Sequence, residues 1–553
     1  MTVTDEHKSD TYLKEMLDMT EDSPLEDLTE SSEITKFFTD QNVLVTGGSG
    51  FMGKLLIEKL LRCCPNIGVL YMFLRPKKGK STEERFKEHF EDAIYDRLKK
   101  ERPRFAEKII MIEADTGAED LDLSAEHRKL LLNTTVIFHG AATVRFDESV
   151  RLATSINVRG TKLLLLFARE MPNLKVFVHI STAFSHCIYK YIEEKFYPPP
   201  IETDKLLTLL DILDDDKLAK MQSTLIDKFP NTYAYTKAVA EDTVRQYSTG
   251  IPTCIVRPSI VIATAKEPIR GWINNLYGPT GVVVGAGIGL LRTLHCDSNK
   301  IADIIPADYV TSNIVVAAWD TATNHKIPAS VRNFSGETKE EEKGSIEQVN
   351  TQEIPIYNSV SCNQKPITWG QFMKFNEVYG WEVPSESVLW YYMFMLNKNR
   401  YVHMICVILL HFLPAAIVDT LAFLTGRKPM LWTAYRKIHK FSDVISYFST
   451  QQWRFNNDNV LKLWERIGPT DRILYNFNLT NLDWSEYFYF HVRGLRIFLI
   501  KDPLTTVKKG RTKFQRLEVA HKTLLTIFFL LLLWAFVSFL RFLWSVFSSY
   551  LEL

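Results

Sequence analysis

The sequence lacks three features that would assign the protein to a functional class directly: a metal-ligand motif, a nucleic-acid-binding module and a secretory signal. It has seven cysteines but no metal-ligand spacing among them, so no metal site is predicted; they are Cys63, Cys64, Cys187, Cys254, Cys296, Cys362 and Cys406. The formal net charge is only +1 and no nucleic-acid-binding module is recognisable, so no nucleic-acid partner is expected. The opening "MTVTDEHKSDTYLKEM" lacks the apolar core of a secretory signal, and we expect reduced thiols facing the cytosol.

Two stretches offer little that a folded core could bury. Residues 1–38 are acidic and rich in hydroxyl groups, which predicts a disordered or loosely held arm. Residues 334–353, which include "SGETKEEEKGSIEQVNTQE", predict an exposed charged loop. The whole chain of 553 residues is nevertheless 46% hydrophobic, which is enough for a sizeable core and for more than one domain.

The segment "QNVLVTGGSGFMGKLLIEKLLRCCP" has the pattern of a buried strand, a glycine turn and an amphipathic helix. Its Gly-x-x-Gly-x-x-Gly spacing is a variant of the dinucleotide fingerprint, in which backbone amides and a helix N-terminus approach a pyrophosphate. A tight turn without a ligand is the alternative. The predicted cofactor contacts here are Thr46, Gly47, Gly48, Ser49, Gly50, Phe51, Met52 and Gly53.

The end of the second strand, "GVLYMFLRPKKGK", indicates which dinucleotide binds. Arg75 stands about where an NAD enzyme places a carboxylate for the ribose hydroxyls, and Lys77 and Lys78 follow it. Because a guanidinium suits a 2′-phosphate, we predict NADPH with Arg75 as the main contact. Solvated strand-end bases are the alternative.

Four further strands, in "KIIMIEAD", "TTVIFHGAATVRF", "LKVFVHISTAF" and "PTCIVRPSIVIA", alternate with helical segments. This rhythm predicts an α/β fold with a doubly wound, Rossmann-type parallel sheet, whose ligand crevice lies at the carboxyl ends of the strands. Asp115 is placed there for an adenine, Ala141 for close approach to the cofactor, and Ser181 and Thr182 as hydroxyls. His139 is interpreted as a packed strand residue, because nothing pairs it with a nucleophile.

Two tyrosines and a lysine in "FPNTYAYTKAVAED" form the remaining candidate site. Residues four apart share a helix face, so Tyr233 pairs with Lys237 while Tyr235 points elsewhere. An ammonium beside a phenol favours its ionised form, which brings its proton transfer nearer to neutral pH. A solvated helix pair is the alternative for this spacing taken alone.

Together these motifs resemble the extended short-chain dehydrogenase/reductases: T-G-x-x-G-x-x-G at Thr46 to Gly53, Asn157 in "NVRGT", the Ser-Thr pair, and Tyr233-x-x-x-Lys237. Further runs narrow the resemblance to the eukaryotic fatty acyl-CoA reductases, from about Asn42 to Lys501. These runs are "TGGSGFMGKLLIEKLLR", "LRPKKG", "AATVRFDE", "STAF", "IRGWINNLYGPTG" and "ADIIPADYV".

The resemblance implies reduction of long-chain acyl-CoA to a primary fatty alcohol with two NADPH, through a bound aldehyde. It assigns Tyr233, helped by Thr182, to the substrate oxygen, and Lys237 to the phenol and the ribose, with Ser181 the less favoured hydroxyl. Arg257, Pro258 and Ser259 would line the cofactor site. For Asn157, an architectural role and a proton relay stay open. The implied division is a reductase domain over 39–330 and a mainly helical C-terminal domain over 355–501.

The tail predicts a C-terminal transmembrane helix over 523–547. "TLLTIFFLLLLWAFVSFL" runs for 18 residues without a charge, and the basic "KKGRTKFQR" before it assigns the body to the cytosolic side. The helix either continues past Arg541 or ends there. We expect the endoplasmic reticulum membrane, with the peroxisome as second choice. A second apolar run, 402–424, contains His403, His411, Pro414 and Asp419. Because such residues are costly in lipid, they favour monotopic contact with membrane lipid over a second span.

Two other functions stay open on the sequence alone. One is an NADPH-dependent membrane-anchored reductase of a different carbonyl, such as a sterol or a sugar nucleotide. The other is a non-catalytic scaffold that keeps the fold, against which the intact Thr182, Tyr233 and Lys237 argue. The chain-length preference and a homo-oligomeric state are left undecided.

Overall fold

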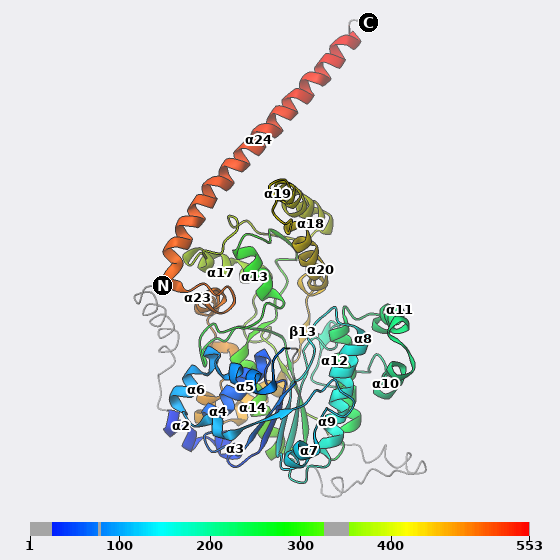
Figure 1. The fold of residues 1–553 in the computed structure, drawn as a ribbon, viewed down its shortest axis with the longest axis vertical. Coiled ribbons are helices and arrows are strands. Elements are labelled where there is room, and N and C mark those ends of the chain that lie inside the picture. Colours follow the sequence, from blue (N-terminus) through cyan, green and yellow to red (C-terminus); the bar gives the residue numbers. More distant parts are fainter. Residues whose placement is uncertain (1–24, 76–78, 326–352, 552–553) are drawn as a thin grey trace.

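A seven-stranded parallel sheet forms the centre of the molecule (Figure 1). The computed structural model describes residues 25–75, 79–325 and 353–551. The strand order is β11-β7-β5-β4-β1-β2-β3, which reverses direction at β1 and so opens a crevice between β1 and β4. The strands are β1 Val43–Thr46, β2 Leu70–Leu74, β3 Ile109–Glu113, β4 Val136–His139, β5 Val176–Ile180, β7 Thr253–Pro258 and β11 Ile356–Ser359.

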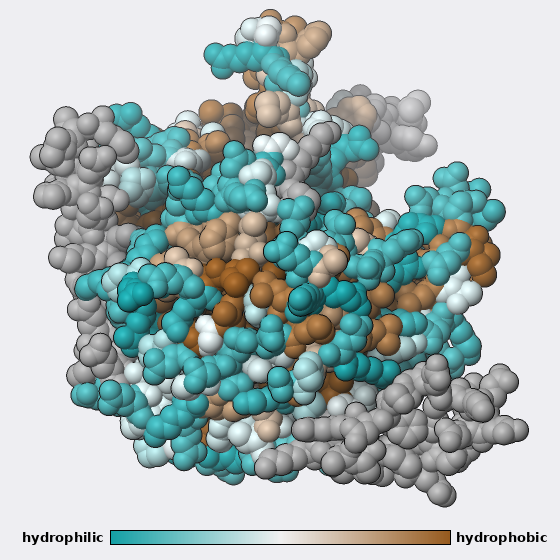
Figure 2. Space-filling model, turned by 60° about the horizontal axis from the view of Figure 1, so that its bottom comes forward, coloured by the Kyte–Doolittle hydropathy of each residue, from teal (hydrophilic) through white to brown (hydrophobic). Residues whose placement is uncertain are grey.

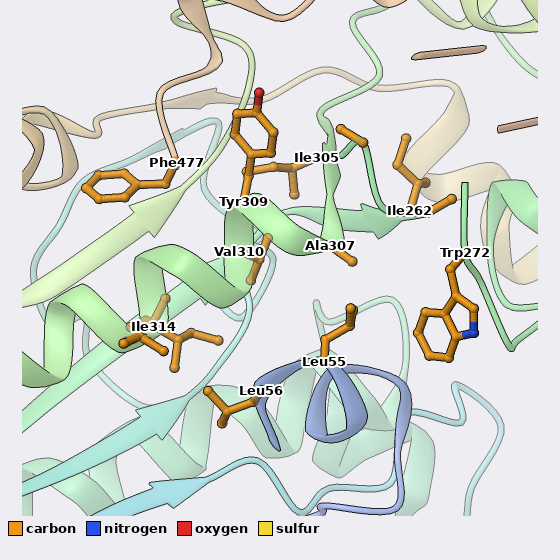
Figure 3. Close-up of a cluster of buried hydrophobic side chains, with 14 of the residues drawn as sticks. Leu55, Leu56, Ile262, Trp272, Ile305, Ala307, Tyr309, Val310, Ile314 and Phe477 are labelled. Atoms are coloured by element: carbon orange, nitrogen blue, oxygen red, sulfur yellow. The ribbon is translucent and has the colours of Figure 1, made fainter. Parts of the chain in front are cut away.

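Helices cover both faces of the sheet, as the doubly wound prediction requires. Side chains alternate along β1: Val43 and Val45 join the cluster around α4 (Phe51–Cys63) and α14 (Ala307–Asn324), while Leu44 joins the opposite cluster. That second face is covered by α9 (Gly160–Ala168) and α12 (Thr232–Tyr247). Figure 3 shows Leu55 and Leu56 of α4 beside Val310 and Ile314 of α14.

Shorter elements connect and extend these layers. The α-helices among them are α5 Thr82–Phe90, α6 Asp96–Glu101, α7 Ala125–Leu131, α8 Val150–Thr154, α10 Thr203–Ile212, α11 Asp215–Ile226, α13 Pro279–Gly287, α21 Asp458–Arg466 and α22 Pro469–Leu474. The short strands are β6 Tyr191–Ile192, β8 Ile260–Ile262, β9 Thr293–His295, β10 Ile304–Pro306, β12 Met395–Asn397 and β13 Arg454–Phe455.

The sheet's outer strand, β11, comes from a part of the sequence predicted to be mainly helical. Its Ile356 pairs with Ile255 of β7, and the whole strand is buried. Residues beyond the predicted loop therefore complete the sheet. That loop, 334–353, falls almost entirely outside the described residues.

The expected loose arm over 1–38 is wrong for its last 14 residues. Residues 25–38 form α2 (Leu25–Ser31) and α3 (Glu33–Phe38), whose Ile34 and Phe38 are fully buried. Ser32 donates to Asp471, and the hydroxyls of Thr35 and Tyr475 lie 3.0 Å apart. An acidic composition did not reveal this docking, because two of its partners, Asp471 and Tyr475, lie more than 400 residues away. Residues 1–24 lie outside the described part of the chain.

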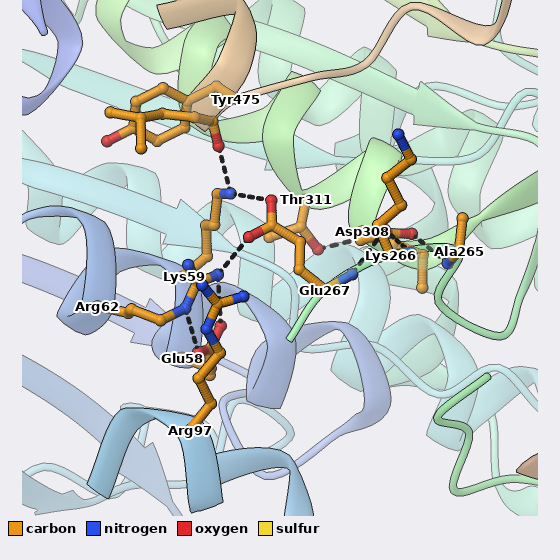
Figure 4. A network of polar contacts seen from close by, with 12 residues as sticks. Glu58, Lys59, Arg62, Arg97, Ala265, Lys266, Glu267, Asp308, Thr311 and Tyr475 are labelled. Atoms are coloured by element: carbon orange, nitrogen blue, oxygen red, sulfur yellow. Dashed lines mark hydrogen bonds and ion pairs between the residues drawn. The ribbon is translucent and has the colours of Figure 1, made fainter. Parts of the chain in front are cut away.

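A network of buried charges fixes α4 to the rest of the body (Figure 4). Arg62 bridges Glu58, one turn earlier, and Glu267, and Lys59 also pairs with Glu267. Asp308 accepts hydrogen bonds from the backbone N–H groups of residues 265–267. These bonds hold the loop that carries Glu267, and with it the orientation of α4.

The C-terminal part is mainly helical. It contains α17 Trp369–Glu382, α18 Arg400–Val407, the π-helical turn η5 Ile408–Phe412, α19 Leu413–Leu424, α20 Leu431–Ser449, α23 Trp484–Gly494 and α24 Val507–Leu551. Two helical stretches, Arg400–Leu424 and Leu504–Ser545, are long and apolar enough to cross a membrane, judged by length and composition. Both lie at the same end of the body (Figure 1). The opposite end, turned forward in Figure 2, is mostly hydrophilic with a central band of apolar side chains.

Candidate active site

One cavity of about 1210 Å³ opens at the carboxyl ends of the strands around the switch point. It brings together nearly all of the residues that the sequence singled out. Its lining includes Thr46, Gly47, Ser49, Gly50, Phe51, Met52, Gly53, Arg75, Asp115, Ala141, Ser181, Thr182, Tyr233, Lys237, Pro258 and Ser259.

The glycine turn forms a cradle that only small residues fit. Gly47 has a φ of +73°, and a Cβ there would lie 2.8 Å from the backbone nitrogen of Ala141. A Cβ at Gly53 would collide with the carbonyl oxygen of Gly47. Gly50 is the N-cap of α4 and has no side-chain cap, so the first N–H groups of the helix face the cavity's edge. This arrangement fits a dinucleotide pyrophosphate. Gly48 lies outside the lining, and a Cβ there would point at the side chains of Ile57 and Met72, 3.0 Å away.

Arg75 and Asp115 lie side by side in the cavity lining, just after the ends of β2 and β3. The Arg75 guanidinium is 4.0 Å from the Asp115 carboxylate, and its side chain is 61% exposed. An exposed pair at this distance is weak, so the guanidinium is available to a ligand phosphate. Lys77 and Lys78 lie outside the described residues.

Tyr233 enters the cavity from the first turn of α12, where Asn231 caps the helix by accepting from the N–H of Ala234. Burial raises the pKa of Tyr233 to about 12, and a hydrogen bond with the Thr182 hydroxyl lowers it in part. The phenol is therefore protonated at neutral pH and can donate to a substrate oxygen. Tyr235 points away from the cavity into a separate apolar cluster.

Lys237 lies one turn after Tyr233 and is buried, with its Nζ donating to the carbonyl oxygen of Ile180 at 2.7 Å. Burial lowers the pKa of Lys237 to about 8, and the nearby Glu241 carboxylate raises it. The causes of the Tyr233 shift do not include Lys237. Desolvation is therefore the largest influence on this phenol, whose pKa lies above its ordinary value, and the expected depression by the Lys237 ammonium stays a prediction.

Ser181 and Arg257 belong to a buried network centred on Glu241. One oxygen of Glu241 accepts from Ser181 at 2.5 Å, Ser185 at 2.9 Å and Arg257 at 2.9 Å. The other accepts from His186 and again from Arg257. The expectation that Arg257 lines the cofactor site is wrong: its side chain is fully buried in this network and is not part of the cavity lining.

Asn157 and His139 support the cavity from behind. Asn157 accepts from the N–H of Thr143 at 2.9 Å and donates to Thr236 at 2.9 Å, so it ties a cavity loop to α12. This favours its architectural role. His139 is 1% exposed and lies between the hydroxyls of Thr46 and Thr161, in agreement with a packed strand residue.

Known proteins match this chain along most of its length. A family model described as "Male sterility protein" matches residues 45–314, and a second with the same description matches residues 410–502. "Fatty acyl-CoA reductase wat" of Drosophila melanogaster is 37% identical over 519 residues, which cover 94% of this chain and 95% of that protein. The chain belongs to the fatty acyl-CoA reductase family. "Fatty acyl-CoA reductase 1" of Mus musculus is 34% identical and covers 89% of this chain and 92% of its own length.

A solved structure shows the same fold as this fatty acyl-CoA reductase family member. The terminal R domain from the myxalamid PKS-NRPS biosynthetic pathway aligns with a TM-score of 0.50 at 17% identity, over 84% of this chain and 93% of that one.

Two features of the site escaped the sequence analysis. Glu241 stands four residues after Lys237, so the same helical spacing that paired Tyr233 with Lys237 places it on their face. The other is an apolar extension of the cavity, whose side chains come from distant segments and carry no common motif. It is lined by Leu294, Cys296, Trp369, Phe372, Met373, Leu396, Ile445 and Phe448.

Proposed function

We propose that this chain reduces long-chain fatty acyl-CoA to the primary fatty alcohol, consuming NADPH and releasing CoA. One observation carries the proposal: a single cavity joins the dinucleotide cradle, the Thr182, Tyr233 and Lys237 group, and an apolar extension. A reductase of a bulkier carbonyl is less well supported, because the extension continues between β9, α17 and α20 and is lined mostly by aliphatic and aromatic side chains.

The residues present fit a nicotinamide dinucleotide. The turn around Gly47 would hold its pyrophosphate, Arg75 its 2′-phosphate, and Lys237 its ribose. The buried Ser259 hydroxyl lines the cavity and has no hydrogen-bond partner among the described residues, so it offers a polar contact within the same cleft. When bound, the cofactor supplies hydride to the carbonyl carbon.

The side chains of this protein would handle the oxygen and the proton. Tyr233 and Thr182 would donate hydrogen bonds to the thioester oxygen and stabilise the alkoxide as it forms. The thiolate of CoA can then leave with little acid help, because a thiolate is a comparatively good leaving group. The aldehyde that remains takes the second hydride, and Tyr233 gives its proton to the alcohol oxygen.

The proposal is tested with detergent-solubilised protein, NADPH and a panel of long-chain acyl-CoA substrates, with the product identified by chromatography. Tyr233→Phe should lower the rate by about 10²–10⁴-fold, because it removes the acid. Tyr235→Phe is the matched control and should leave the rate nearly unchanged. Equal loss in both variants would contradict the assignment, and NADPH binding without turnover in the parent protein would overturn the proposed reaction.

The NADPH assignment has its own test. Arg75→Glu should weaken NADPH binding by roughly 10- to 100-fold, because a hydrogen bond to a charged group contributes roughly 1.5–3 kcal/mol. NADH binding should change little. Arg104→Glu, at another exposed arginine that pairs with Glu107, is the control. An unchanged preference for NADPH over NADH in Arg75→Glu would contradict the assignment.

We also propose that α24 anchors the protein in a membrane with its body on the cytosolic side. The apolar part of this helix is exposed along its length, and Lys508, Lys509, Arg511, Lys513 and Arg516 precede it.

A further inference from the structure

Within the apolar stretch Arg400–Leu424, His403, His411 and Asp419 would be costly in lipid, and each has a hydrogen-bond partner in the protein. His411 accepts from the N–H of Arg292 at 2.9 Å, and its other ring nitrogen lies 2.9 Å from His439. His403 lies 3.1 Å from the hydroxyl of Thr293. Asp419 accepts from three backbone N–H groups at the start of α20, at 2.8–3.1 Å. The two histidines are buried and therefore face inward, whereas Asp419 binds the start of α20 at the more exposed turn between the helices.

The outer face of the same stretch is apolar and exposed. Phe423 and Leu424, next to the turn into α20, are 72% and 73% exposed. Other exposed apolar side chains on this face and the adjoining turn are Val402, Met404, Ile405, Ile408, Leu409, Leu413, Ile417, Val418, Leu421, Met430 and Trp432. A contiguous apolar surface of this kind marks an interaction site.

The path of the chain argues against a membrane span here. After the turn, α20 returns alongside α19 and carries the exposed Arg436, Lys437 and Lys440. A bilayer that enclosed α18 and α19 throughout would also enclose these charges, and charged side chains at that depth are unfavourable. The pair of helices therefore suits the membrane surface, where the apolar side meets acyl chains and the charges stay in the headgroup layer.

Charge and position point to one occupant of this surface. Residues 400–449 hold six basic and two acidic side chains, and Arg427 and Lys428 lie in the turn beside Phe423 and Leu424. Both apolar helical stretches leave the same end of the body (Figure 1). The base of α24 is held there by Trp390, whose ring nitrogen donates to His521 at 3.1 Å. A bilayer that takes up α24 would therefore meet this surface.

We propose that residues 400–449, here called the surface hairpin, insert their apolar side into the surface layer of an anionic bilayer. The inner end of α20 contributes Ile445, Phe448 and Ser449 to the cavity lining. One helix thus links the surface hairpin to the cavity's apolar extension, which would bring an acyl chain from the bilayer close to the cavity. This last step rests on the proposed function, whereas the membrane contact does not.

The contact is tested in the full chain, reconstituted into phosphatidylcholine vesicles with or without phosphatidylserine. Environment-sensitive fluorophores are attached at Phe423→Cys, Leu532→Cys in α24, or Ile212→Cys, an exposed site on α10. The background lacks Cys362 and Cys406, because the other five thiols are buried. Nitroxide-labelled lipids should quench the probe at 423 most from a shallow position and the probe at 532 most from the bilayer centre. The probe at 212 should not be quenched.

Three outcomes would overturn the proposal. Absence of lipid quenching at 423 would place the hairpin in water, and energy transfer between probes at 423 without lipid quenching would assign the face to a second copy of the chain. Probes at 401 and 423 that react with an impermeant reagent on opposite sides of the vesicle would show a span. None of these readouts depends on turnover, so each is independent of the proposed function.

The charge argument has a separate variant. Arg427→Glu with Lys428→Glu should reduce quenching at 423 several-fold in vesicles that contain phosphatidylserine and change it little in phosphatidylcholine alone. Lys205→Glu with Lys217→Glu, two exposed lysines on α10 and α11, is the matched control and should have no effect in either lipid. Equal quenching of the parent and the hairpin variant in both lipids would overturn the anionic preference.

Discussion

The phenol of Tyr233 and the ammonium of Lys237 share one face of α12 but have different surroundings. Tyr233 meets the cavity, with Phe146 at 6.0 Å between ring centroids, and Phe146 in turn stacks on Phe448. Lys237 donates a hydrogen bond to the backbone carbonyl of Ile180, and the nearby carboxylate of Glu241 raises its pKa. Burial disfavours the charged form of both groups, so it raises the pKa of the phenol and lowers that of the ammonium. The phenol therefore keeps its proton, and Lys237 is the group of this pair that titrates nearest neutrality.

This difference predicts the alkaline limb of the pH–rate profile. Activity should fall by about tenfold per pH unit as the pH rises through about 8, because Lys237 then loses the charge that supports the site. Unfolding would not explain this loss. The unfolded lysine has a pKa of about 10.4, so between the two values the unfolded state holds more protons and this group's contribution to stability rises with pH. Initial rates measured beside thermal denaturation across pH 7–10 check both trends.

Glu241→Gln should move this limb to lower pH by on the order of one unit, because the carboxylate raises the pKa of Lys237. The variant leaves Arg257 buried without its counter-charge and should lose about 3–5 kcal/mol of stability. Adding Arg257→Gln removes the buried cation that lacks a counter-charge, so that the pH profile can be measured in a folded protein. Asp242→Asn, on the other side of the same helix, should leave the limb in place. A limb that stays unchanged in Glu241→Gln would exclude the electrostatic role of this carboxylate.

At the scale of elements, short sequence patterns predicted those features that depend on interactions between residues close in the sequence. The glycine turn after β1, the succession of strands along the chain and the face shared by Tyr233 and Lys237 follow from local patterns, and the structure contains each of them. The seventh strand, the docking of α3 and the apolar extension depend on contacts between residues more than a hundred positions apart. No short pattern encodes such contacts. Arg257 was misplaced for a different reason: its partner Glu241 lies only 16 positions earlier in the sequence but was not recognised.

The docking of α3 can be measured through two neighbouring phenylalanines. Phe38 is fully buried and stacks on Phe138 of β4 with 6.5 Å between ring centroids, whereas Phe37 is only partly buried. Phe38→Ala should therefore lower the free energy of unfolding by about 3–5 kcal/mol. Phe37→Ala should cost clearly less. Denaturant unfolding of the detergent-solubilised proteins gives the comparison, and two small, equal losses would show that α3 does not pack on the sheet in solution.

At the scale of the whole molecule, the reductase cavity and the candidate membrane helix are separate parts. The cavity lining runs from Val45 to Ser449, and the candidate span in α24 has none of its apolar window buried against the body. The helix contacts the body along its first third, from Gly510 at Pro384 to His521 at Trp390. Function and anchoring should therefore be separable by a cut after these contacts.

A chain that ends at Lys522 should fold and keep the cavity, because everything removed is outside the core. It should reduce a water-soluble, medium-chain acyl-CoA with a kcat close to that of the full chain. It should also bind anionic vesicles weakly and reversibly through the surface hairpin, since an interfacial helix is held far less firmly than a spanning one. Steady-state kinetics and vesicle co-sedimentation with rising salt check the two statements. If the shortened chain folded but lost turnover on the soluble substrate, α24 would have a role in the cavity that its exposed position does not predict.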